Sequence, residues 1–118
     1  MSAESELYDL LTTAAGVTAL VGAQVYPDLV PQGKEPPYVG FERVSTVPVA
    51  TIHGTVLANE VAMTVACWAA TRLAAEGLAD AVDAAMLAAG HIYTARGAEI
   101  DEATNRVAAT LDYLLLIQ

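Results

Sequence analysis

Residues 60–70, with the sequence EVAMTVACWAA, decide the fold of this chain. Two sets of residues alternate along this stretch, one of Val61, Met63, Val65 and Cys67 and the other of Ala62, Thr64, Ala66 and Trp68. A period of two predicts a β-strand, because successive side chains of a strand point to opposite faces of its sheet. Both sets are largely apolar. The strand is therefore either central in its sheet or covered on one face by another subunit.

Three more strands are expected around this one. Residues 38–45 form the strand before it, and an irregular hairpin tip over residues 46–57 joins the two. Residues 91–95 form a short strand, and residues 106–117 form a long terminal one. The polar, acidic residues 96–105 between them predict a loop. A stiff, proline-punctuated loop is predicted over residues 27–37, because proline suits neither a helix interior nor a central strand.

Two main helices are expected. Residues 4–15 place Leu7, Leu10, Leu11 and Ala14 on one face, with Ser2 as the N-cap and Gly16 as the terminator. Residues 17–21 add one short helical turn that Gly22 closes.

The second main helix spans residues 72–89, between a Thr71 N-cap and the terminator Gly90. Its apolar stripe consists of Ala74, Gly77, Leu78, Ala81, Val82, Ala85 and Met86. Glu76, Asp80 and Asp83 lie on the other side, which predicts a solvated face with modest help from an Arg72–Glu76 pair.

This order of elements predicts a single domain over residues 1–118, of the α+β class. We expect a mainly antiparallel four-stranded sheet with the two main helices packed on one face. The other face would present Thr64, Ala66, Trp68, Leu114 and Leu116, which are too apolar for open water. Association with other subunits is the simplest cover for that face.

Composition supports association and argues against several partners. The chain is 55% hydrophobic and only 16% charged, against about 25% charged in ordinary soluble domains. Its formal net charge of −9 argues against coating a nucleic acid and against docking on anionic membranes. A single cysteine rules out an internal disulfide and suits synthesis in a reducing cytoplasm. The charge-free residues 10–27 are too polar to span a bilayer, and no membrane segment is expected.

No set of residues converges on a reaction. Ser45 lacks a nucleophile-elbow motif, and Cys67 within a strand is expected to be a buried, inert thiol with a raised pKa. His53 and His91 have no cysteine or carboxylate at ligand spacing, and the acidic cluster of Glu99, Asp101 and Glu102 lacks the EF-hand spacing. We therefore expect no catalytic, metal or cofactor site, and the chain is not predicted to be an enzyme.

The candidate functional residues are instead those of an interface. They lie at the hairpin tip, on the second sheet face and in the acidic loop: His53, Gly54, Thr55, Val56, Leu57, Trp68, Glu99, Asp101 and Glu102.

Several segments together resemble one family, the tail-completion or tail-terminator proteins of long-tailed bacteriophages, also called tail-to-head joining proteins. The matching pieces are LYDLL at 7–11, VTALVG at 17–22, VYP at 25–27, PQG at 31–33, PYV at 37–39, FERV at 41–44, VAMTVACWA at 61–69 and AEGLADAV at 75–82. The resemblance covers residues 5–90. The chain departs from the family in two places. Cys67 stands where a more polar residue is usual, and residues 96–105 match no pattern of the family.

The resemblance implies a virion protein that forms a ring, a homo-hexamer, at the head-proximal end of the tail. Such a ring caps the tail tube, stops its growth and offers a docking surface to the head–tail connector. DNA passes through its lumen without specific binding, and acidic groups facing the lumen would let it slide. Prophages and gene transfer agents carry similar subunits.

Two other interpretations stay open at this stage. The chain could be a head-side neck protein that closes the connector. It could also be a small enzyme or ligand-binding module with a pocket near His53 or His91.

Overall fold

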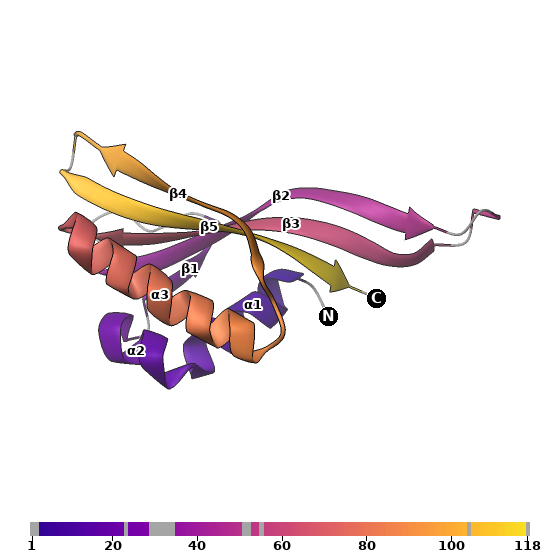
Figure 1. Cartoon of the computed structure of the whole chain (residues 1–118), viewed down its shortest axis with the longest axis horizontal. Helices are drawn as coiled ribbons and strands as arrows, with labels where there is room; N and C mark the ends of the chain where they lie inside the picture. The colour runs from indigo at the N-terminus through magenta and orange to yellow at the C-terminus, as the bar shows by residue number, and fades with distance from the viewer. Residues whose placement is uncertain are drawn as a thin grey trace.

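The computed structural model describes residues 3–22, 24–28, 35–50, 53–54, 56–103 and 105–117. Three helices and one five-stranded sheet make up this part of the chain (Figure 1). Their order is α1 (Ala3–Thr13), α2 (Ala15–Val21), β1 (Val25–Pro27), β2 (Tyr38–Ala50), β3 (Val56–Ala69), α3 (Arg72–Ala88), β4 (Tyr93–Asp101) and β5 (Arg106–Ile117). The predicted α+β class is confirmed.

The sheet is mixed and has one strand more than predicted. Its order is β1-β2-β3-β5-β4, with β1 parallel to β2 and every other pair antiparallel. The additional strand β1 has only three residues and ends in Pro27. Proline is tolerated there because β1 lies at the edge of the sheet, where one side of a strand needs no ladder hydrogen bonds.

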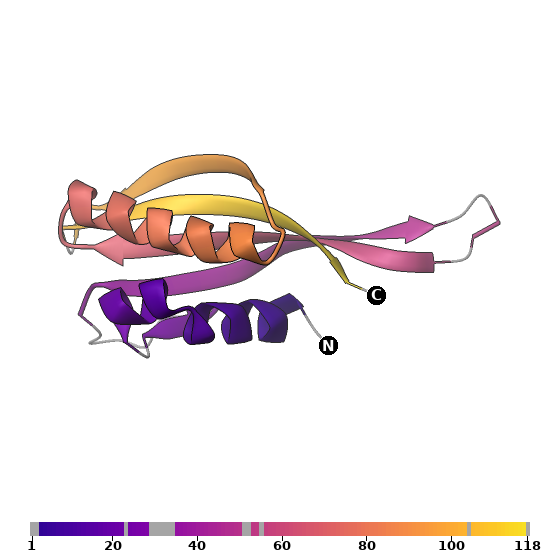
Figure 2. The ribbon, with the colours of Figure 1, turned by 60° about the horizontal axis from the view of Figure 1, so that its bottom comes forward.

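The helices cover one face of the sheet, and the core lies between the helices and that face (Figure 2). As predicted, β3 alternates: its odd-numbered residues from Val61 to Cys67 are buried and the even-numbered ones between them are half-buried. The odd-numbered residues Leu111, Tyr113 and Leu115 of β5 are buried as well. The sheet face turned away from the helices is called the outer face below.

The first helix ends earlier than predicted. α1 stops at Thr13 and α2 starts at Ala15, so Gly16 lies inside the second helix and does not terminate the first. Ala14 between them is extended, and the hydroxyls of Thr12 and Thr13 donate hydrogen bonds of 2.7 Å to the backbone oxygens of Tyr8 and Asp9. Such local bonds compete with helix continuation. The predicted cap Ser2 lies outside the described residues.

The long helix α3 has the predicted ends but a different buried stripe. The Thr71 hydroxyl accepts a hydrogen bond of 3.2 Å from the amide of Ala74, and Gly90 follows the helix with φ of 89°. The buried residues are Ala75, Leu78, Ala79, Val82 and Met86, so the stripe is turned toward Ala75 and Ala79. Ala74 and Gly77, predicted for the stripe, are exposed.

Three strands are longer than predicted. β4 continues to Asp101, so the acidic loop expected over residues 96–105 is mostly an edge strand paired with β5. Its polar side chains suit an edge, because charges discourage pairing with foreign strands. β2 also extends to Ala50, and β3 already begins at Val56. Most of the expected irregular tip over residues 46–57 therefore belongs to these two strands. None of the described helices is long and apolar enough to cross a membrane.

Candidate assembly surfaces

The hairpin of β2 and β3 projects well beyond the helices, as an arm (Figure 1). We define the arm as residues 44–59. The burial of β2 changes abruptly at its base: Tyr38–Phe41 are buried, and the nine residues after them are all exposed. The projection makes the molecule long, with extents of 51 × 29 × 23 Å.

Large apolar side chains are exposed on the outer face at the base of the arm. We call Val44, Val47, Val49, Leu114 and Leu116 the arm patch; their exposed fractions are 63%, 53%, 38%, 46% and 67%. The sheet register brings them together, because Val47 and Leu116 both pair with Glu60, on opposite sides of β3. Glu60 itself stands between these two residues, so one carboxylate interrupts the patch. Large contiguous apolar patches are typical of interaction sites, which makes this face a candidate.

The arm carries no formal charge, although the chain has a net charge of −9. No Asp, Glu, Lys or Arg occurs among its residues 44–59, and His53 is its one titratable side chain. The outer edge of β2 is open along the arm, because β1 pairs with β2 only as far as Phe41. Proteins usually protect such edges with charges, bulges or a cover. The nine exposed residues of β2 at this edge carry no charge after Arg43. The edge is therefore suited to burial against another molecule.

Trp68 lies on the outer face near the other end of the sheet. Its ring is 6.5 Å from that of Tyr38, and the Arg106 guanidinium carbon lies 5.8 Å from the Tyr38 ring centroid. Arg106 also donates a hydrogen bond of 3.1 Å to the Tyr38 hydroxyl. Trp68 and Glu99 line one shallow hollow, since both stand beside Ala108 in the sheet register.

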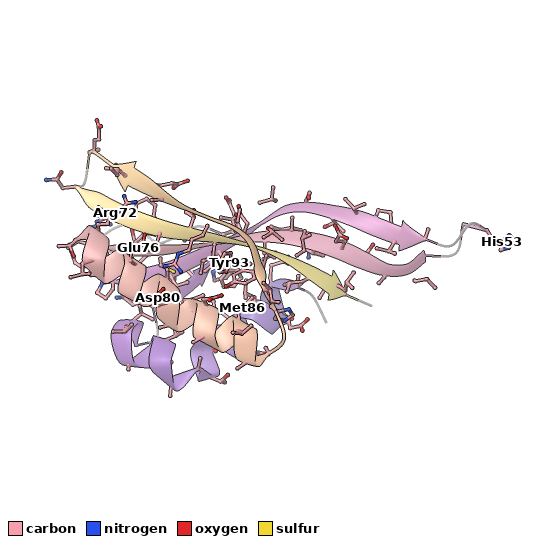
Figure 3. All side chains as sticks on the ribbon, viewed as in Figure 1. His53, Arg72, Glu76, Asp80, Met86 and Tyr93 are labelled. Atoms are coloured by element: carbon pink, nitrogen blue, oxygen red, sulfur yellow. The ribbon has the colours of Figure 1, made fainter. Side chains whose placement is uncertain are left out.

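The other acidic residues follow Glu99 into the turn between β4 and β5. The Asp101 carboxylate accepts a hydrogen bond of 3.1 Å from the amide of Ala103, and Glu102 is exposed. Asn105 has φ of 58°, in the left-handed region that asparagine tolerates at turns. The turn and the arm tip, marked by His53, lie at opposite ends of the molecule (Figures 1 and 3).

The predicted interface residues therefore form two separate groups. Trp68, Glu99, Asp101 and Glu102 belong to the end with the β4–β5 turn, and His53, Gly54 and Leu57 belong to the arm. Thr55 lies outside the described residues, and of Val56 only the strand backbone is described. Sequence reasoning placed Leu114 and Leu116 on this face, and both are exposed there. It missed Val44, Val47 and Val49, because they join these two leucines only through the pairing of β2, β3 and β5.

The acidic face predicted for α3 is partly engaged within the chain (Figure 3). Arg96 of β4 donates to the carboxylates of Glu76 at 2.7 Å and Asp80 at 3.0 Å. The hydrogen bond to Glu76 is the main cause that raises the pKa of Arg96. The predicted solvation of Glu76 is wrong for this reason: its partner is Arg96, which sequence reasoning had placed in a loop. The pairs fasten the edge strand β4 to α3.

Asp83 is also half-buried and not fully solvated as predicted. Its carboxylate accepts a hydrogen bond of 3.1 Å from the Tyr113 hydroxyl. Burial, together with the nearby Asp83 charge, raises the pKa of Tyr113.

Cys67 is a buried thiol with a raised pKa, as predicted. The side chain is fully buried, and burial raises its pKa to about 12. Nucleophilic chemistry needs a thiolate, which is scarce at neutral pH with such a pKa. Within the described ranges, no cluster of three or more His, Cys, Asp or Glu residues could hold a metal ion.

The fold and surfaces described above suit a subunit of a larger protein assembly: a packed body, an exposed uncharged arm and an open sheet face. The chain belongs to the family described as "Tail completion protein gp17", whose model matches residues 5–113. It is therefore a structural protein of a phage-like virion, located in the tail.

Comparison with solved structures agrees on the fold. A chain in the structure "Virion of native gene transfer agent (GTA) particle" aligns with 99% of this chain and 98% of its own length, with a TM-score of 0.73 and 22% sequence identity. No curated protein matches the sequence significantly.

Proposed function

We propose that six copies of this chain form a closed ring at the head-proximal end of the tail. The ring ends growth of the tail tube and joins the tail to the head–tail connector. Its partners are other copies of itself, the tail tube protein and the connector protein, and DNA passes through its lumen. The proposal extends the family assignment, which gives a structural role in the tail.

The arm is the observation that carries this proposal. Nine consecutive residues of β2 are exposed while the arm contains no charge, so the arm contributes little to the stability of the isolated chain. Burying the arm patch in an assembly would remove large apolar side chains from water, which is the main favourable contribution to most protein association. A ring that caps a tube needs such surfaces toward its neighbours.

The charge distribution supports a lumen through which DNA slides. Of the five basic residues, Arg43 pairs with Glu4, Arg96 with Glu76 and Asp80, and Arg106 with Glu35. Binding to phosphates requires Lys and Arg side chains that are available to them. A ring of subunits with a net charge of −9 each, three of whose five cations are engaged with carboxylates, repels DNA and lets it pass.

Disruption of the gene tests the proposal, with electron microscopy of the particles that form. We expect tails of abnormal length, or finished tails that fail to join heads. Normal joined particles would contradict the proposal. Heads that leak DNA beside finished tails of correct length would instead identify a neck protein that closes the connector.

A further inference from the structure

The pairing of β2 with β3 contains two register shifts that cancel each other. In the first, just after Arg43, β2 carries one extra residue, and in the second, just before Ala50, β3 carries one. Outside the two shifts, the pairs Arg43–Met63 and Ala50–Val56 belong to one common register. Residues 45–49 between them are offset by one position against β3. Since the two strands have the same number of residues between these pairs, an uninterrupted ladder, which we call the straight register, is also available to this sequence.

The offset decides which face of the sheet the arm valines occupy. Directly opposite residues of an antiparallel pair share a face, and the offset register sets Val47 opposite Glu60. Val49 stands opposite Ala58 in the same way, so both valines lie on the outer face with the even-numbered residues of β3. In the straight register Val47 would stand opposite Asn59. It would then turn to the other face, because a slip by one residue turns every side chain over.

Each register shift leaves one residue without a ladder partner. The straight register would restore both partners, so the offset register needs features of its own that favour it. Two such features occur at the base of the arm.

The first feature is a hydrogen bond that the offset register makes possible. The Arg43 guanidinium binds the Glu4 carboxylate through Nε at 2.6 Å and Nη2 at 2.9 Å, and its Nη1 donates to the Thr46 hydroxyl at 3.0 Å. Arg43 stands opposite Met63, which is buried beneath the helices. The offset sets Thr46 opposite Val61, on the same face. The straight register would turn Thr46 to the outer face, away from this guanidinium.

The second feature is Pro48, which has no amide hydrogen to donate. The amide of Val39 donates to the backbone oxygen of Gln24, on the side away from β3. Because the backbone groups alternate along a strand, odd-numbered residues in this part of β2 point away from β3 and even-numbered ones point toward it. The straight register would continue this alternation and turn Pro48 toward β3, where a ladder hydrogen bond would be missing. The offset reverses the alternation and turns Pro48 to the open edge, where no donor is needed.

We propose that Arg43, Thr46 and Pro48 hold the arm in the offset register. They act as positioning residues: the hydrogen bond favours this register, and the proline opposes the straight one. The outward position of Val47 and Val49 in the arm patch is a consequence. The inference concerns the fold of a single chain and is tested on that chain, so its outcome is independent of the proposed ring.

Nuclear magnetic resonance of the purified protein tests the register directly. Contacts between backbone Hα atoms are closest where two opposite residues are not hydrogen-bonded to each other. The native chain should therefore show such contacts between residues 46 and 61 and between residues 48 and 59.

The double variant Thr46→Val with Pro48→Val removes both features and leaves the ion pair of Arg43 with Glu4 in place. Valine suits a strand at either position. We expect the native contacts to be lost and replaced by those of the straight register, between residues 45 and 61 and between residues 47 and 59.

Two matched variants separate the two features. Thr46→Ser with Pro48→Val keeps a hydroxyl for Arg43, so more of the protein should stay in the offset register than with valine at both positions. Thr46→Val alone should keep the native contacts, because Pro48 still opposes the straight register.

Three results would overturn the inference. Native contacts kept in full by the double valine variant would show that other residues set the register. Equal populations of the straight register in the serine and valine double variants would show that the hydrogen bond does not select it. Loss of all contacts in the arm, with those of the body kept, would show that these residues hold the two strands together and do not choose between registers.

Discussion

The body and the arm of this molecule are built from the same two strands, yet only the body buries side chains. Within the body, Phe41 of β2 and Val65 of β3 are at most 2% exposed beneath the helices. Beyond Phe41 the ladder between β2 and β3 continues to Ala50, with a register shift at Val44, and all nine residues of this part of β2 are exposed. Backbone pairing thus extends past the point where burial ends. The difference indicates that the body provides most of the stability, and it supports the proposed role of the arm in assembly.

The largest expected contrast lies between two substitutions on β2. Phe41→Ala should lower the free energy of unfolding by about 3–5 kcal/mol, because it empties a fully packed position in the core. Val47→Ala should change it by about 0.5 kcal/mol at most, since the side chain is 53% exposed. Urea unfolding of the monomeric protein measures both. Comparable losses from the two variants would break the distinction between body and arm.

The body should also lose stability at alkaline pH, because it buries the Cys67 thiol. The arm contains no cysteine or tyrosine that could contribute to this loss. The folded Cys67 thiol keeps its proton to about pH 12, whereas the unfolded thiol loses it above about 9.0. Between these values the folded state binds more protons, so stability falls with rising pH, by up to about 1.4 kcal/mol per pH unit for one group.

Cys67→Ala should flatten this alkaline decline, as followed by urea unfolding at a series of pH values. Tyr113, whose pKa is raised in the same direction, leaves part of the decline in place. An unchanged slope in Cys67→Ala would show that the thiol is not held protonated by the fold.

The smallest expected effect concerns the edge strand β4. Arg96→Met should cost about 1 kcal/mol, because it removes a partly exposed ion pair that fastens β4 to α3. Amide exchange in β4 should rise more than in β3. Arg72→Met is the matched control, because Arg72 is exposed at the start of α3. We expect it to change stability little. Equal losses of stability in the two variants would show that Arg96 does not fasten β4 to α3.

The sequence predicted those parts of the fold whose periodicity is clear. The alternation in residues 60–70 identified the central strand, and Thr71 with Gly90 bounded the long helix. These signals are local, because the burial pattern or the ends of each element are encoded in its own residues and their immediate neighbours.

The sequence could not predict features that depend on a neighbouring element. β1 has three residues and becomes a strand only beside β2, and β4 looks like a loop until β5 supplies its partner. The Arg96–Glu76 pair joins two elements 20 positions apart, and the arm patch needs three strands in register. The interface residues predicted at the arm and near Trp68 stay predictions.

Replacement of the outer part of the arm, residues 48–59, tests the central claim most directly. Val47 pairs with Glu60, so residues 48–59 can be replaced by Asn-Gly, a two-residue turn that closes antiparallel strands. The stability of the shortened monomer and its assembly into tails are then measured on the same protein. The account predicts an unfolding free energy within about 1 kcal/mol of the original, together with loss of the ring and of joined particles. A loss of several kcal/mol, or normal assembly without residues 48–59, would contradict it.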